Sequence, residues 1–242
     1  IQPGMLHGAL VWTPHPKCRV LRIDASKALA LEGVHAVVIA EDFGPDRKVG
    51  LIYRDWPVMI AVGEETRCVA DILAAVAADT RELALWARDL IEVEVEELVP
   101  TTDLALAAMD PDNVLTTCNV VKGDAAAALE GECDIVITES FWVQPIDQAF
   151  LEPEASLAIP DADGGLHIYS CGQGVFDDQK LLCPLFDLPP EKLVVELVPT
   201  GGDLAPKKTS TCSPRRPCWP SRPASRSRWP SLWRSPPGFI PS

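Results

Sequence analysis

The sequence predicts an α+β protein of short strands and helices, followed by a basic C-terminal segment that we expect to be disordered. Residues 92–99 (EVEVEELV) alternate Glu with apolar residues, which is the period of a half-buried strand. Residues 70–77 form a largely apolar run, and residues 81–91 between these segments carry apolar side chains at helical spacing. With 242 residues, the chain is long enough for one large domain or two small ones.

The N-terminal part holds three predicted strands and one short helix. Two prolines separate the first two strands, and Asp24 is the expected N-cap of the helix. A polar, irregular excursion follows the third strand. The strands cover residues 5–13, 18–23 and 35–40, the helix continues to about Ala30, and the excursion covers 41–56.

The central unit is a strand, a helix and a second strand. Thr80 is expected to cap the helix, because a threonine hydroxyl accepts well from the first free backbone amides. The glutamates of the strand at 92–99 are interpreted as a solvated face without a catalytic role. The buried face of the helix is predicted to consist of Leu83, Trp86, Ala87, Leu90 and Ile91.

The remaining patterned region predicts two small helices, three strands, a longer helix and a last strand. Pro184 lies within the longer helix, where an interior proline costs about 3 kcal/mol. The small helices cover 101–109 and 124–131 on either side of a linker at 110–122. The strands cover 133–143, 150–160, 165–173 and 192–199, and the longer helix covers 176–187.

Charge divides the chain sharply after Asp203. All 35 acidic residues lie at or before that position, whereas 8 of the 21 Lys and Arg residues lie after it. The formal charge of −14 is therefore −22 before the division and +8 after it. A strongly acidic body argues against non-specific nucleic-acid binding by residues 1–203.

The remaining composition predicts a cytoplasmic protein with reduced thiols. No apolar run approaches the length of a membrane span, no signal peptide is recognisable, and none of the eight Cys forms a C-x-x-C pair. A zinc or iron–sulfur site within the chain is therefore not expected. The four His are isolated and interpreted as structural, and four tryptophans are expected to pack in a core or at its edge, namely Trp12, Trp56, Trp86 and Trp142.

Three stretches in order along residues 1–203 together resemble one family, the molybdenum-cofactor subunit of xanthine dehydrogenases and aldehyde oxidases. They are PGMLHGALVWTPHPKCRVLRIDASKALALEGVHAVVIAEDF, EETRCVADILAAVAADTRELALWARDLIEVEVEELVPTTD, and QPIDQAFLEPEASLAIPDADGGLHIYSCGQGVFDD with its continuation LPPEKLVVELVPTGGD. DWPVM and GQGVFDD are most similar to the bacterial selenium-dependent xanthine dehydrogenase branch. The resemblance implies an α/β-hammerhead domain at 1–105, the first and incomplete part of a molybdopterin-binding α+β domain at 106–203, and a tail at 204–242.

The resemblance also implies an activity, cofactors and partners for the intact parent protein. Such a protein hydroxylates purines, other nitrogen heterocycles or aldehydes with oxygen from water, at a molybdenum held by a pterin. Electrons leave through iron–sulfur clusters and FAD on other domains or subunits. The expected parent is a dimer of multi-subunit units acting on a small-molecule substrate, with no membrane partner.

Four residues of this sequence match cofactor positions of the family. Gln173 corresponds to the glutamine that hydrogen-bonds near the molybdenum oxygen, although a glutamine before a glycine is also an ordinary loop residue. Gly201 and Gly202 correspond to the G-G-x-F-G turn, in which Leu204 replaces the phenylalanine. Glu152 and Glu154 match a family landmark without a catalytic role, and Gln148 stands where the family usually has His. No catalytic or metal-ligating residue is predicted in this chain.

The tail after Asp203 has two interpretations. Loss of one base in the codon of Leu204 would explain it, because the neighbouring frame permits F-G-A-K-E-D-L-N-V-Q, A-L-L-A, T-G-K-P-V-K and E-E-S-x-R-x-H-P-K, the continuation of the family in order. Lys208 then stands where the family has its substrate-contacting Glu, and the chain alone is expected to be inactive. The alternative is a non-catalytic acidic domain with a disordered Ser/Arg/Pro tail that binds nucleic acid or an acidic partner.

Overall fold

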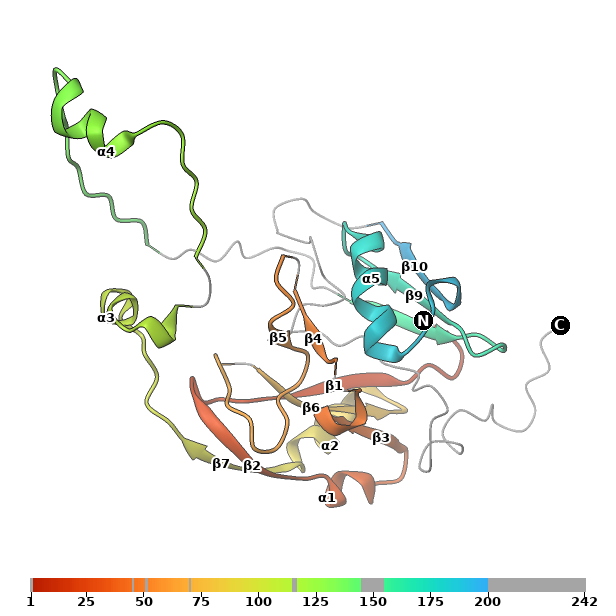
Figure 1. The fold of residues 1–242 in the computed structure, drawn as a ribbon. Helices are drawn as coiled ribbons and strands as arrows, with labels where there is room; N and C mark the ends of the chain where they lie inside the picture. The colour runs from red at the N-terminus through yellow and green to blue at the C-terminus, as the bar shows by residue number, and fades with distance from the viewer. Residues whose placement is uncertain are drawn as a thin grey trace. The chain divides into compact units, whose positions relative to one another are not determined.

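The computed structural model describes residues 2–44, 46–50, 52–69, 71–114, 117–144 and 155–199 (Figure 1). These residues form two compact units. One unit contains the described residues up to 99 together with 155–199, and the other contains those from 100 to 144. Helices and strands are mixed in the way the sequence predicts, which confirms the α+β class.

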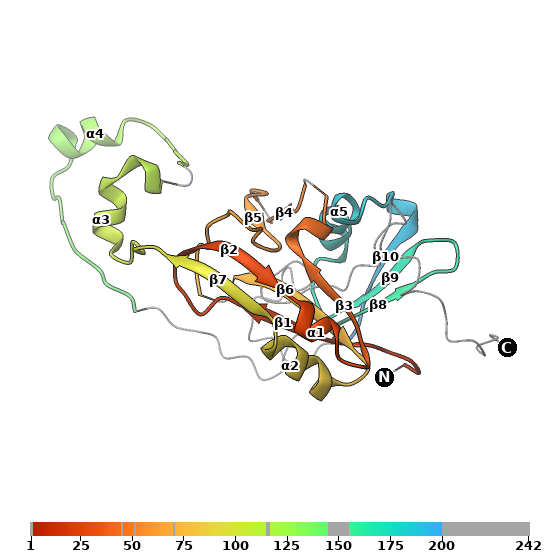
Figure 2. The ribbon, with the colours of Figure 1, turned by 90° about the horizontal axis from the view of Figure 1, so that it is seen from below.

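The centre of the first unit is a three-stranded antiparallel sheet of order β1-β6-β3 (Figure 2). Its middle strand is buried at every residue, as the apolar run at 70–77 predicts. Small side chains dominate that strand, so a helix can approach the sheet closely on one face and loops can cover the other. The strands are β1 (His7–Trp12), β3 (Val34–Ile39) and β6 (Ile72–Ala78).

Helix α2 (Arg81–Asp89) packs against all three strands of this sheet. Its N-cap is Thr80, whose Oγ1 accepts from the backbone amide of Leu83 at 3.1 Å, so the predicted cap is confirmed. The buried positions are Ala84 and Ala87. The helix therefore approaches the sheet through these alanines, and Leu83 packs beside them.

The predicted position of Trp86 on the buried face of α2 was wrong, since 57% of its surface is exposed. Trp12 and Trp142 are also exposed, at 50% and 81%, and only Trp56 is half-buried. The other predicted positions are confirmed, since Ala87 and Ile91 are buried and Leu83 and Leu90 pack against the core clusters. A tryptophan facing the sheet would hold the helix away from the alanine-rich strand β6, and the alanines allow closer packing.

Strands β2 (Cys18–Asp24) and β7 (Glu92–Glu97) form an antiparallel ribbon beside the sheet. The glutamates of β7 are exposed, which confirms the solvated face. Helix α1 (Ser26–Leu29) follows β2 with Ala25 at the N-cap position, one residue later than predicted. Asp24 nevertheless accepts from the amide of Ser26 at 2.9 Å.

The segment between β3 and β6 is largely irregular, as predicted, with three short elements. It contains the 3₁₀ helix η1 and two strands of two residues each, which pair with one another. Phe43 and Val58 from this segment pack against the core of the first sheet and also against the core of the second. The elements are η1 (Ala40–Asp42), β4 (Lys48–Val49) and β5 (Trp56–Pro57).

A second sheet, of order β10-β9-β8, completes the first unit. Strand β8 pairs antiparallel to β9, whereas β10 pairs parallel to it after helix α5. The core between α5 and the sheet contains Leu166, Ile168, Leu182 and Phe186. The elements are β8 (Ser156–Pro160), β9 (Leu166–Ser170), α5 (Val175–Phe186), the 3₁₀ helix η4 (Pro190–Lys192) and β10 (Leu193–Leu197).

Helix α5 contains Pro184 without interruption. The proline is exposed and lies in the last turn, two residues before the helix ends at Phe186, so it removes one backbone bond close to the C-terminus. Burial raises the pKa of the neighbouring Cys183 thiol, which therefore stays protonated and packs as an apolar group.

The second unit holds short helical segments and no buried residue among those whose burial is described. Asp103 and Asp124 cap these segments with their carboxylates; the second start agrees with the prediction, whereas the first helix begins three residues later than the predicted 101. The strand predicted at 133–143 was wrong, since these residues are exposed and belong to no strand of the described chain. The segments are α3 (Leu104–Met109), η2 (Pro111–Asn113), α4 (Ala125–Ala127) and the π-helical turn η3 (Ala128–Glu132).

Candidate functional site

The candidate site lies at the edge of the second sheet where two parallel strands end together. Ser170, the last residue of β9, is the register partner of Leu197, the last residue of β10. The backbone amide of Val198 continues the ladder by donating to the carbonyl of Ser170 at 2.9 Å. The carboxyl ends of parallel strands share one edge of a sheet, and open α/β sheets commonly bind ligands at this edge.

Gln173 is in the loop that leaves this edge. The loop runs from Cys171 to Gly174, and its last residue is the N-cap of α5. Cys171 and Gly172 are buried, whereas Gln173 is exposed. The structure therefore presents the predicted glutamine to solvent directly beyond the carboxyl end of β9.

Two buried polar residues support this loop. The hydroxyl of Ser170 accepts from the amide of Gly172 at 3.0 Å and donates to Oδ2 of Asp178 at 3.4 Å. Ser170 and Asp178 are both 0% exposed. Nothing in the sequence pattern singles out either residue, because an aspartate in the first turn of a helix normally faces water.

A third side chain fixes the other end of the crossover. The amide of Gln179, on α5, donates to the carbonyls of Pro190 at 3.1 Å and Leu193 at 2.7 Å. One glutamine thus joins the helix to η4 and to the first residue of β10. The crossover is therefore held where it enters α5 and again where it reaches β10.

The other predicted site residues lie outside the described residues. These are Gly201, Gly202, Leu204 and Lys208, together with the landmark residues Gln148, Glu152 and Glu154. Three residues lie between Leu197 at the end of β10 and Gly201. The described chain therefore heads into the glycine segment from the same sheet edge that presents Gln173.

The residues present fit a neutral, hydrogen-bonding contact to a pterin-held metal better than direct metal ligation. Gln173 offers an uncharged amide between two glycines, able to donate and to accept. Within the described ranges, no group of three or more His, Cys, Asp and Glu side chains could hold a metal ion. Asp177 and Asp178 in the first turn of α5 disfavour an anion at that helix N-terminus.

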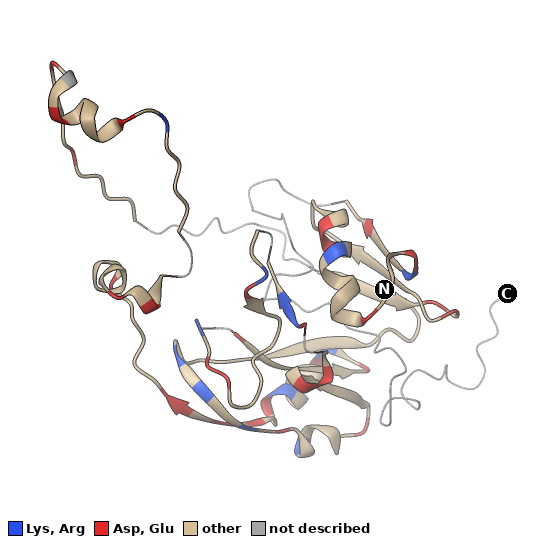
Figure 3. Ribbon diagram, viewed as in Figure 1, with Lys and Arg blue, Asp and Glu red and all other residues tan. Residues whose placement is uncertain are grey.

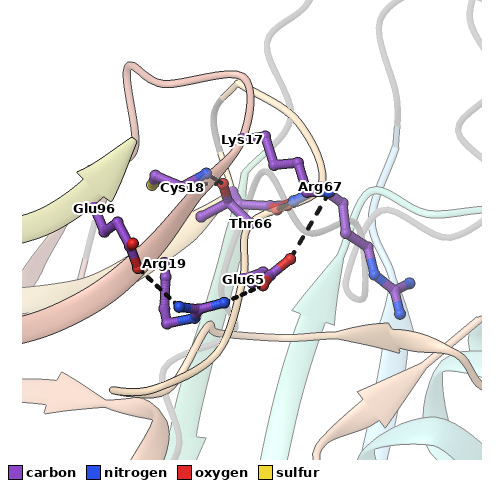
Figure 4. Close-up of polar contacts among 8 residues, drawn as sticks. Lys17, Cys18, Arg19, Glu65, Thr66, Arg67 and Glu96 are labelled. Carbon is purple, nitrogen blue, oxygen red and sulfur yellow. Dashed lines mark hydrogen bonds and ion pairs between the residues drawn. The ribbon is translucent and has the colours of Figure 1, made fainter. Parts of the chain in front are cut away.

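A second polar cluster, on the β2–β7 ribbon, has the geometry of a surface ion-pair network (Figure 4). Arg19 contacts Glu65 and Glu96 at 2.7 Å each, and hydrogen bonding to Glu65 raises its pKa further above the usual range. All three side chains are exposed by two-fifths or more. Opposite charges thus face each other across the ribbon (Figure 3).

Two family models match the chain, in the order that the sequence predicts. Residues 1–99 match the a/b hammerhead domain of aldehyde oxidase and xanthine dehydrogenase. Residues 107–209 match the molybdopterin cofactor-binding domain. The second match includes Gln173, Gly201, Gly202 and Leu204 and continues six residues beyond Asp203.

Individual relatives agree with these matches. A probable xanthine dehydrogenase subunit of Bacillus subtilis is 31% identical over 220 residues, which are 88% of this chain and 29% of the relative. The nicotinate dehydrogenase large molybdopterin subunit of Eubacterium barkeri is 30% identical over 212 residues, 85% of this chain and 49% of the relative. The chain thus spans less than half the length of either relative.

A solved structure shows the same fold. The aldehyde oxidoreductase from Desulfovibrio gigas superposes with a TM-score of 0.71 at 29% identity, over 84% of this chain and 24% of that one. In the described part of the chain, no helix is both long and apolar enough to cross a membrane. The two domain matches, their order and this superposition show that the chain belongs to the family of molybdenum-cofactor subunits of xanthine dehydrogenases and aldehyde oxidases.

Proposed function

We propose that this chain supplies the hammerhead domain and one side of the cofactor pocket of a molybdenum hydroxylase. The observation that carries the proposal is the parallel pairing of β9 with β10, which brings the Gln173 loop and the approach to Gly201 to one sheet edge. The reaction is hydroxylation of a purine, another nitrogen heterocycle or an aldehyde, with oxygen taken from water. The proposed domain boundaries are 1–105 and 106–203, with a separate tail at 204–242.

When bound, a pterin-held molybdenum supplies a Lewis-acidic and redox-active centre that can transfer oxygen. The role of this chain is to bind and orient. The amide of Gln173 is placed to hydrogen-bond a neutral or anionic oxygen without adding charge. Gly201 and Gly202 have no side chains, which would let their backbone amides approach the cofactor closely.

The remaining groups that the reaction requires are proposed to lie in other parts of the enzyme. Since the chain spans 29% of the Bacillus subtilis relative, we place the catalytic base and the later cofactor contacts in the unmatched remainder. Iron–sulfur and flavin subunits or domains would accept the electrons, in an assembly that is a dimer of multi-subunit units. We further propose that this assembly is cytoplasmic.

The tail is proposed to be read out of frame after Asp203. Sequencing the genomic DNA around codon 204 tests this directly. If the genomic DNA holds one base more than the codons of residues 204–242 require, the family continuation is restored and the proposal is supported. An unchanged DNA sequence, together with detection of the tail by mass spectrometry, would reject the proposal.

The cofactor role is tested in a host that makes the molybdenum cofactor. We expect the chain as given to contain little molybdenum and not to oxidise xanthine, and an allele with the base restored to bind molybdenum. In that allele, Gln173→Ala should lower the molybdenum content or turnover at least tenfold, whereas the exposed Gln2→Ala should not change either. Stoichiometric molybdenum with xanthine turnover in the chain as given would overturn the proposal.

A further inference from the structure

Ser170 joins three parts of the candidate site. Its carbonyl accepts from Val198 at the end of β10. Its hydroxyl accepts from Gly172 in the glutamine loop and donates to Asp178 in the first turn of α5. One fully buried residue therefore contacts the loop and the helix through its hydroxyl and the neighbouring strand through its backbone carbonyl.

Asp178 closes this arrangement from the helix. Its backbone amide donates to the carbonyl of Gly174 at 2.8 Å, in the loop's last residue, and its carboxylate receives the Ser170 hydroxyl. Both ends of the loop are consequently fixed to the same aspartate, one through the backbone and one through Ser170. A carboxylate at 0% exposure needs hydrogen-bonding partners, so its position in the fold is narrowly defined.

We propose that Ser170 and Asp178 are positioning residues that set where the Gln173 amide stands relative to the end of β10. The identity of the ligand that Gln173 contacts rests on the proposed function. The hydrogen bonds that support its loop do not. Gly172 contributes no side chain to packing, so the buried loop backbone depends on its amide bond to Ser170 Oγ. Without that acceptor, the buried N–H would have to open toward water, and Gln173 would move with it.

Amide hydrogen exchange on the full chain tests the proposal. Ser170→Ala should speed exchange at Gly172 at least tenfold and leave exchange in β6 unchanged. Ser170→Thr keeps the hydroxyl and should restore protection to within twofold of the native chain. Ser140→Ala, which removes an exposed hydroxyl from the other unit, is the matched control and should have no effect at Gly172.

Three further variants keep the test decisive if Ser170→Ala does not fold. Ser170→Cys preserves the side-chain volume but substitutes a weak thiol acceptor, so Gly172 should again lose protection. Asp178→Ala should loosen the loop more than Asp178→Asn, which retains an acceptor for the hydroxyl. The proposal would be overturned if Gly172 exchanged within twofold of the native rate in every variant whose β6 amides exchange at the native rate. Faster exchange combined with unchanged molybdenum in Gln173→Ala of the restored allele would reject the proposed function alone.

Discussion

At the scale of single residues, Gly50 has the least room for a side chain among the glycines of the described ranges. A Cβ built at Gly50 would lie 1.8 Å from the carbonyl oxygen of Tyr53, which is backbone and cannot rotate away. We expect Gly50→Ala to destabilise the fold by about 1–3 kcal/mol, the usual cost of forcing atoms into filled space. Urea denaturation followed by circular dichroism would measure this loss.

Gly44→Ala is the matched control for Gly50. A Cβ at Gly44 meets no atom within 4 Å, so this variant should stay within about 0.5 kcal/mol of the native chain. Equal stabilities of the two variants would show that the turn after β4 does not need glycine.

Asp187 ends helix α5 in the left-handed conformation, with φ of 52°. The following amide, of Leu188, donates to the carbonyl of Cys183 at 2.9 Å, which is the bond pattern of a glycine-terminated helix. Asp187→Gly should stabilise the chain by about 0.5–1 kcal/mol, because glycine adopts this conformation without steric cost. Asp187→Ala should destabilise it, so opposite signs in thermal or urea unfolding are the expected result.

The sequence predicted some of the site residues but not the residues that support them. Gln173 could be identified because the family resemblance marks it, and its exposed position agrees with a binding role. Ser170 and Asp178 could not, because the burial of a polar side chain depends on hydrogen bonds from segments that are distant in sequence. The burial of Trp86 was predicted wrongly for a related reason: Trp86 lies at the margin of the apolar stripe, and only packing against the alanine-rich β6 decides which side chains at that margin are buried.

At the scale of elements, the segment 61–66 protects the free edge of β2. Val20 donates to the carbonyl of Glu64 at 3.0 Å and accepts from the amide of Gly63 at 2.7 Å. Glu64 is held in turn by an ion pair with Arg47 and by the amide of Ala61 at 2.9 Å. One carboxylate thus fixes the turn that covers this edge.

The Glu64 pair predicts a pH-dependent stability. Burial raises the pKa of Glu64, but the hydrogen bonds from Arg47 and Ala61 outweigh it and leave the pKa below its usual value of 4.5. A lowered folded pKa stabilises the fold above the unfolded value, and this contribution is lost as the pH falls through the folded value. Glu64→Gln should therefore cost about 0.5–1 kcal/mol at pH 7 and progressively less below about pH 4.5.

Urea titrations at pH 7 and pH 3 would measure this difference. Glu32→Gln is the control, because the Glu32 side chain is exposed and forms no ion pair within the described part of the chain, and its effect should be small at both values. A Glu64→Gln deficit that is equal at pH 7 and pH 3 would rule out the ion pair as its cause.

Elements with strong local signals were predictable, and those that depend on a distant partner were not. Alternation predicted β7, an apolar run predicted β6, and a threonine cap predicted the start of α2. Residues 133–143 carry an equally apolar pattern but form no strand, since a strand needs a neighbour for its backbone groups. The parallel pairing of β9 and β10 was likewise not evident from either segment alone.

At the scale of the whole molecule, apolar surface is distributed very unevenly between the two units. The first unit buries continuous clusters around both of its sheets. The second exposes its large apolar side chains, among them Ile137 at 78%, Phe141 at 90% and Trp142 at 81%. Local stability should follow this difference, because opening costs free energy where apolar contacts must be broken.

Hydrogen exchange of the complete chain should therefore separate the units by rate. Amides of β6, which pair on both sides and are buried throughout, should exchange about 1,000-fold or more slowly than those of residues 133–143. Strand β9, the central strand of the other sheet, is an internal reference and should behave like β6. Protection at 133–143 equal to that of β9 would mean that this segment pairs in solution, as its sequence pattern predicts, with a strand from outside the described residues. The exchange rate of this single segment thus decides whether its apolar pattern forms a strand in the chain as it stands.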